Sequence, residues 1–145
     1  MRSMETERSA GYLMKRVQQS LRRRCDAALR PTGLSMAQYA ALRALADLPD
    51  ASASELARRC FVTRQSLQDL LTGLRSAGLV TDASTAPRGR ARALALTAAG
   101  RKRLAAGDAA VDAVDVAMVD GLTPPERNRL AAMLVQCAEN LERAP

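Results

Sequence analysis

The chain has 145 residues, which is the length of one ordinary domain and too short for two independent hydrophobic cores. It contains no histidine, so a Ser-His-Asp triad, a Cys-His pair and a zinc–histidine site are all excluded. The sequence also has no phosphate-binding glycine loop and no carboxylates paired for acid–base work. We therefore expect a protein that is not an enzyme and that uses neither a cofactor nor a metal ion.

The formal charge of +7 points to a polyanionic partner. It is unevenly distributed: residues 1–107 carry 19 Lys and Arg against 8 acids, whereas residues 108–145 carry 3 against 7. No uncharged apolar run approaches the roughly 18 residues of a membrane span, and the N-terminus leads into no apolar signal core. We expect a soluble cytoplasmic protein without a membrane partner, whose basic surface belongs to the first three-quarters of the chain.

The first predicted helix spans residues 9–29 and is ended by Pro31 and Gly33. Its apolar stripe recurs at steps of three and four residues and consists of Leu13, Val17, Leu21, Cys25 and Ala28. Ser35 and Gln38 then form a capping-box pattern, which predicts a second helix that runs to about residue 48.

A helix-turn-helix pattern follows. Ser52 or Ser54 can cap a short third helix that runs to Arg59, and residues 60–62 form the turn. Thr63 is a good N-cap for the next helix. The apolar stripe of that helix, which we expect to face the core, consists of Leu67, Leu70, Leu71 and Leu74. Its opposite, polar face carries Arg64, Gln65, Gln68, Asp69 and Thr72.

A small β-hairpin is predicted directly after this motif. Residues 79–81 have the pattern of a first strand, residues 83–89 of a turn-rich connection, and residues 90–96 of a return strand. Three arginines fall within five residues of the hairpin: Arg88, Arg90 and Arg92. The order of these elements predicts a mainly α fold of the winged helix-turn-helix class, with the hairpin as the wing.

Two long helices close the chain. Thr97 caps the first, over roughly residues 98–120, and Thr123 and Glu126 form a capping box at the start of the second. The apolar stripe of the last helix consists of Leu130, Met133, Leu134, Cys137 and Leu141. The long helices at the two ends of the chain carry more apolar surface than one small helix-turn-helix unit needs to cover, which favours a helical dimer interface. The alternative is that they fill the core of a monomer.

The second helix of the motif is predicted to read DNA, because a major groove accepts one α-helix and base edges are read near its N-terminus. Arginine can pair with guanine and glutamine with adenine, whereas hydroxyl groups and a helix N-terminus suit phosphates. Arginines on a hairpin tip can enter a neighbouring minor groove. The predicted DNA contacts are Ser52, Ser54, Thr63, Arg64, Gln65, Ser66, Gln68, Arg88, Arg90 and Arg92. The alternative is that the polar face and the basic loop are only solvated surface.

Over residues 10–142 the sequence resembles the multiple-antibiotic-resistance regulator (MarR) family of winged-helix repressors and activators. The segments that carry the resemblance are Gly33-Leu34-Ser35-Met36-Ala37-Gln38-Tyr39, Ser54-Glu55-Leu56-Ala57, Val62-Thr63-Arg64-Gln65-Ser66-Leu67, Leu74-Arg75-Ser76-Ala77-Gly78-Leu79-Val80 and Leu96-Thr97-Ala98-Ala99-Gly100. The resemblance implies a single domain over residues 1–145, with a DNA-binding lobe at about 35–97. It also implies an obligate homodimer, formed by helices at about 9–30 and 98–142.

One departure from the family concerns the wing. Where the family has Asp-Arg-Arg or Asp-x-Arg before the second strand, this chain has Arg88-Gly89-Arg90. Arg90 matches the wing arginine that contacts DNA in the family, but Arg88 replaces the acid that helps to brace the wing. The alternatives are a more mobile wing, a more strongly cationic wing, or a wing braced by another partner.

The resemblance further implies a small phenolic or lipophilic effector, bound between the dimer helices and the DNA-binding lobe. Tyr12, Met14, Met36 and Tyr39 can line such a pocket. The alternative is that they are ordinary core, as Met and aromatic residues at helical spacing usually are.

The cysteines Cys25, Cys60 and Cys137 lie far apart and in no metal-like or CxxC spacing, so we expect reduced, mostly buried thiols. Cys60 is close in sequence to three arginines, Arg58, Arg59 and Arg64, and cationic neighbours lower the pKa of an exposed thiol. We prefer the alternative of a buried structural thiol, because free cysteine is among the most buried residue types.

The preferred hypothesis is a sequence-specific transcriptional regulator. A symmetric dimer would place its two recognition helices in successive major grooves of a pseudo-palindromic operator, with half-sites about 10 base pairs apart. Repression would follow from blocking polymerase, and release from a ligand that favours another spacing of the helices. The competing hypothesis is a winged-helix module for protein contacts, or an anti-regulator that has lost DNA binding.

Overall fold

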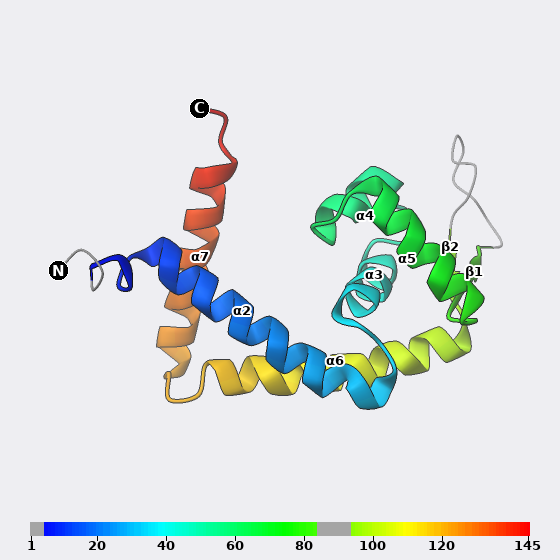
Figure 1. The fold of residues 1–145 in the computed structure, drawn as a ribbon, viewed down its shortest axis with the longest axis horizontal. Helices are drawn as coiled ribbons and strands as arrows, with labels where there is room; N and C mark the ends of the chain where they lie inside the picture. The colour runs from blue at the N-terminus through cyan, green and yellow to red at the C-terminus, as the bar shows by residue number, and fades with distance from the viewer. Residues whose placement is uncertain (1–4, 84–93) are drawn as a thin grey trace. The chain divides into compact units, whose positions relative to one another are not determined.

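The computed structural model describes residues 5–83 and 94–145 of the chain (Figure 1). The elements are α2 (Ala10–Leu29), the short 3-10 helix η1 (Arg30–Thr32), α3 (Met36–Asp47), α4 (Ala53–Arg59), α5 (Arg64–Ser76), β1 (Val80–Asp82), β2 (Leu94–Leu96), α6 (Ala98–Met118) and α7 (Pro124–Glu142). They group into two compact units, Met1–Val114 and Asp115–Pro145. The predicted mainly α architecture with one small hairpin is confirmed.

Helices α3, α4 and α5 begin at polar residues that the sequence predicts as caps. The Ser35 hydroxyl accepts from the Gln38 amide at 3.1 Å, and the Gln38 side-chain oxygen accepts from the Ser35 amide at 2.9 Å, which completes the predicted capping box of α3. Of the two candidate caps of α4, Ser52 is the one used, since its hydroxyl accepts from the Glu55 amide at 3.2 Å. Thr63 caps α5 in the same way.

The core of the first unit is built mainly from leucines. Leu29 of α2, Leu42 of α3 and Leu74 of α5 are completely buried. The predicted core face of α5 is confirmed at Leu67, Leu71 and Leu74, whereas Leu70 is half-buried. Burial of several large apolar side chains per helix stabilises these elements far more than their intrinsic propensity does.

Two glycines allow α6 to pack closely within the first unit. A Cβ atom at Gly100 would collide with the backbone carbonyl of Leu79, and one at Gly107 would come within 2.7 Å of the Tyr39 ring. Leu104, one helical turn after Gly100, is buried between these two contacts. The beginning of α6 is thereby fixed against the hairpin and against α3.

The hairpin is antiparallel, with Val80 opposite Leu96 and Asp82 opposite Leu94. Its first strand begins one residue later than predicted, because Leu79 is used to close the end of α5: the Leu79 amide donates to the Leu74 carbonyl at 3.0 Å. The predicted return strand is confirmed at Leu94–Leu96. Its first residues and the three predicted wing arginines, Arg88, Arg90 and Arg92, lie outside the described residues.

Helix α7 belongs to the second unit and begins as predicted. The Thr123 hydroxyl accepts from the Glu126 amide, the Glu126 carboxylate accepts from the Thr123 amide at 3.0 Å, and prolines occupy the first turn. Yet no side chain of α7, which the structure describes in full, is buried. Among the helices that the structure describes, none is long and apolar enough to cross a membrane.

Candidate nucleic-acid interface

Helices α4 and α5 form a helix-turn-helix whose buried face is apolar. Leu56 and Ala57 of α4 are buried in the same cluster as Leu67 of α5. The turn between the helices is closed by backbone bonds, with the Val62 amide donating to the Ala57 carbonyl at 3.0 Å. Phe61, at the centre of the turn, has a left-handed backbone with φ of 56°.

The first turns of α5 present a polar surface. All five predicted contacts in this stretch are exposed: Thr63, Arg64, Gln65, Ser66 and Gln68. Three of them carry local bonds, since the Thr63 hydroxyl donates to the Ser66 hydroxyl at 3.0 Å and the Gln65 side-chain amide donates to Asp69 at 3.2 Å. The structure therefore brings these side chains together at one helix N-terminus, which is where base edges and phosphates are contacted in a helix-turn-helix.

The two serines at the start of α4 differ in their surroundings. Ser52 is half-buried, and its hydroxyl both accepts from the Glu55 amide and donates to the Glu55 carboxylate at 3.0 Å. Ser54 is exposed on the first turn of α4. Ser52 thus serves the fold as a cap, and the DNA contact predicted for each serine stays a prediction.

An ion pair that the sequence did not predict joins α5 to the hairpin. Arg75 near the end of α5 donates to both carboxylate oxygens of Asp82 in β1, at 2.9 and 3.2 Å. Such bidentate geometry fixes direction as well as distance, although both side chains are exposed and the pair contributes little stability. Arg75 and Asp82 are seven residues apart, with the end of α5 between them, and no sequence-spacing rule predicts such a pair. The ion pair at the base of the hairpin is therefore evident only from the fold.

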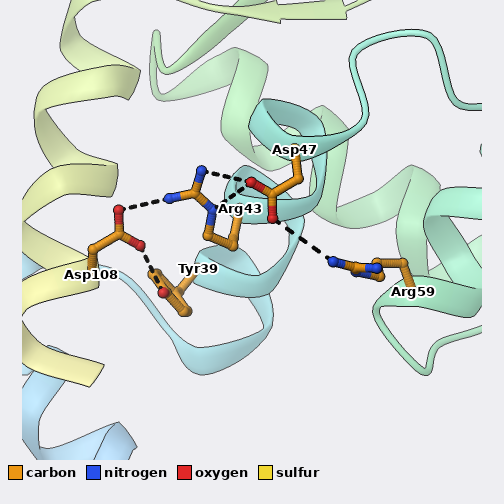
Figure 2. Close-up of polar contacts among 5 residues, drawn as sticks. All are labelled: Tyr39, Arg43, Asp47, Arg59 and Asp108. Atoms are coloured by element: carbon orange, nitrogen blue, oxygen red, sulfur yellow. Dashed lines mark hydrogen bonds and ion pairs between the residues drawn. The ribbon is translucent and has the colours of Figure 1, made fainter. Parts of the chain in front are cut away.

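A polar network connects three helices of the first unit (Figure 2). The Tyr39 hydroxyl donates to one oxygen of Asp108 at 2.8 Å, and the Arg43 guanidinium donates to the other at 2.7 Å. Arg43 also bonds Asp47 at 2.8 Å, and Asp47 lies 3.9 Å from Arg59 of α4. Burial, followed by the bond to Asp108, raises the pKa of Tyr39, in keeping with the protonated hydroxyl that donates to Asp108.

The four predicted pocket residues fall into two places. Tyr39 is buried and Met36 packs against the same core, whereas Tyr12 and Met14 of α2 are exposed by 44% and 37%. A hollow of about 570 Å³ does lie between the end of α3, the hairpin and α6, but none of the four lines it. A pocket role for these residues stays a prediction.

The prediction of mostly buried thiols holds only for Cys25. Cys60 and Cys137 are only half-buried: the first ends α4 at the turn, and the second lies on α7, none of whose side chains is fully buried. Burial nevertheless raises the pKa of the Cys60 thiol, with Arg59 opposing the shift. This favours a structural thiol over a reactive one.

A sequence model of the MarR family matches residues 32–91, which include the helix-turn-helix. The HTH-type transcriptional repressor Rv2887 of Mycobacterium tuberculosis is 37% identical to this chain over 124 residues, which cover 86% of this chain and 89% of the relative. The chain belongs to the MarR family. The predicted resemblance is thus confirmed.

Solved MarR structures extend the likeness to the whole chain. A crystal structure of Rv2887 in complex with DNA is 35% identical, with a TM-score of 0.71 over 93% of this chain and 98% of that one. The complex of Rv2887 with salicylic acid gives 36% identity and a TM-score of 0.73, over 89% and 96%. A MarR-family regulator from Silicibacter pomeroyi reaches a TM-score of 0.84 at 26% identity, over 99% and 97%. The winged helix-turn-helix fold class is therefore confirmed.

Proposed function

We propose that this MarR-family chain is a sequence-specific DNA-binding transcriptional regulator that acts as a homodimer. The observation that carries the proposal is the two-sided character of α5, whose leucines are buried while the polar residues of its first turns are exposed together. The relative Rv2887 has been crystallised with DNA, and it is named a transcriptional repressor. The protein would work where the DNA is, in the cytoplasm, and without catalysis.

In the proposed complex α5 lies in the major groove. Arg64 would donate to the O6 and N7 atoms of guanine, and Gln68 would bond adenine, while the amide groups at the start of α5 face a phosphate. The wing arginines would hold the flanking minor groove, with Arg90 in the position of the family's wing arginine. Arg75 and Asp82 support this arrangement, because they tie the end of α5 to the first strand of the wing.

Dimerisation is supported by apolar surface that the single chain leaves open. Met133, Leu134 and Val135 of α7 are exposed by 43% to 56%, and Leu141 by 84%. On α2, Leu13 and Val17 of the predicted stripe are exposed by 38% and 49%. A second copy that covers these faces would set the distance between the two recognition helices, and hence the spacing of the half-sites. In this proposal the whole chain acts as one MarR-like domain.

Ligand-controlled repression is the form of regulation that we propose. Rv2887 has been crystallised with salicylic acid and with p-aminosalicylic acid, both aromatic carboxylic acids with a phenolic hydroxyl. An effector of this class would act by binding one dimer geometry better than another, because a ligand shifts an equilibrium only by its differential affinity.

The test is a gel-shift titration of the protein on the DNA upstream of its own gene against a scrambled duplex of equal length, at several salt concentrations. We expect tighter binding to the upstream DNA with two chains per site. Arg64→Ala should lower that affinity by about 5- to 100-fold and relax the preference over the scrambled duplex, since one base contact is worth about 1–3 kcal/mol.

The matched control is Arg143→Ala, which removes the same charge at the end of α7. It should leave both affinities almost unchanged. Failure of the wild-type protein to bind any duplex, including those selected from a random library, would contradict the proposal and favour the protein-contact module.

A further inference from the structure

Phe61, in the turn between α4 and α5, is placed where a bulky residue is costly. Its side chain is 96% exposed, so its ring gains nothing from the core. Its φ of 56° lies in the left-handed region, which glycine adopts readily and a bulky residue does not. A glycine here would fit the turn better and would expose no apolar ring. When a chain keeps a side chain against both costs, a contact outside the chain is the physical reason to look for.

The backbone of the turn is fixed independently of the ring. The Phe61 amide donates to the Arg58 carbonyl at 3.1 Å, and the Val62 amide donates to the Ala57 carbonyl at 3.0 Å. Ala57 is buried beneath the turn. The left-handed conformation is therefore imposed by the helix-turn-helix, and only the identity of the side chain needs another explanation.

The surroundings of Phe61 define the chemistry of its partner. Phe61 lies two residues before Thr63, the cap of the recognition helix. Three exposed arginines lie within three residues of Phe61 in sequence: Arg58, Arg59 and Arg64. Arg59 lies 3.9 Å from Asp47, while the other two have no acid within two residues of them in sequence. An apolar ring among cationic groups fits a partner that combines negative charge with apolar surface. DNA does so, because thymine methyl groups and deoxyribose rings lie beside its phosphates.

We propose that the Phe61 ring makes apolar contact with DNA beside the recognition helix, against thymine methyl groups or deoxyribose. The inference rests on the proposed function, since it assumes that α5 enters the major groove. The neighbouring arginines neutralise phosphates, while the ring adds affinity that does not depend on charge. A neutral side chain releases no counterions, so its share of the affinity leaves the salt dependence unchanged.

The experiment compares Phe61→Gly and Phe61→Leu with the wild-type protein on the duplex that the wild type selects from a random library. Phe61→Gly should bind about tenfold more weakly at every salt concentration, with the same slope of log affinity against log salt. Phe61→Leu, which keeps an apolar side chain, should retain an intermediate affinity. Replacement of thymine by uracil in the duplex removes the methyl groups and so distinguishes the two contacts. If Phe61 contacts methyl groups, the replacement weakens DNA binding by the wild type but not by Phe61→Gly. If Phe61 contacts deoxyribose, it weakens DNA binding by neither of these two proteins.

Thermal unfolding supplies a second measurement, which tells whether weaker DNA binding by Phe61→Gly comes from a lost DNA contact or from a less stable fold. Phe61→Gly should melt about 2–6 °C higher than the wild type, because the left-handed backbone costs glycine less. The inference is overturned if Phe61→Gly binds the duplex as tightly as the wild type, or if its melting temperature falls, since the ring would then be held by contacts within the protein. Loss of all selection by the wild type would instead contradict the proposed function itself.

Discussion

Helices α5 and α7 begin in the same way but differ in how much of their apolar face is buried. Each begins at a threonine whose hydroxyl accepts from an amide three residues later, Thr63 in α5 and Thr123 in α7. Each also carries an apolar stripe at helical spacing. However, α5 buries Leu67, Leu71 and Leu74, whereas no residue of α7 is buried along its described length. Capping and periodicity are therefore enough to place a helix, but burial depends on a partner, which α5 finds within the chain.

The largest effect expected from this comparison is the loss of the dimer. Leu134→Asp places a charge on the apolar face of α7, and a charge that must be buried against a second copy costs several kcal/mol. The dimer should dissociate, and affinity for the operator should fall by about 100-fold or more. Sedimentation velocity and gel shift measure the two effects.

The control for this variant is Gln136→Glu, which adds the same charge at a polar position of α7 that bonds Asn140. It should remain dimeric. A Leu134→Asp protein that stays dimeric would show that the face of α7 is not the interface.

The second effect concerns the stability of the unit that contains α5. Leu74 is completely buried, so Leu74→Ala should lower the free energy of unfolding by about 3 kcal/mol, through lost burial and the cavity left behind. Urea unfolding measures the change. Leu70→Ala removes the same atoms from a half-buried position and should cost clearly less; equal costs would contradict the account of α5 as a helix held by one buried face.

The smallest expected effect is a pH dependence of the N-terminal cap of α7 that the cap of α5 lacks. In α7 the Thr123 amide donates to Glu126, and this bond lowers the pKa of the Glu126 carboxyl below its ordinary value of 4.5. A carboxyl whose folded pKa is depressed contributes stability above its unfolded pKa, and this is lost as the pH falls through the folded pKa. The residue at the equivalent place in α5 is Ser66, which has no such titration.

Amide hydrogen exchange, followed from pH 4.5 downward after correction for the intrinsic exchange rate, measures this effect. Protection of the first turn of α7 should decline with acid, and that of α5 should not. Glu126→Gln serves as the control, because it keeps an acceptor for the Thr123 amide and should abolish the pH dependence. A parallel decline in both helices would indicate general acid unfolding instead of titration at one cap.

Prediction of the helix-turn-helix geometry from the sequence succeeded where the signals were local, whereas the DNA contacts themselves stay predictions. The cap at Thr63, the buried leucines and the exposed polar residues of α5 all follow from spacing along one helix. The turn itself was placed correctly at residues 60–62, but nothing in the spacing reveals that Phe61 is left-handed and fully exposed. The half-buried state of Cys60 and Cys137 was missed because cysteine is usually buried and the sequence does not show which faces remain uncovered.

By itself the sequence determined the order of the helices, the caps of α3, α5, α6 and α7, the hairpin and the winged helix-turn-helix class, because each depends on residues within a few positions of one another. Only the tertiary structure decided which distant residues meet. Asp108 contacts Tyr39 and Arg43 across more than 60 residues, and Gly100 lies against the Leu79 carbonyl where no side chain fits. Periodicity states which face of a helix is apolar, but the partner of that face depends on how the helices pack, and packing is a property of the whole chain.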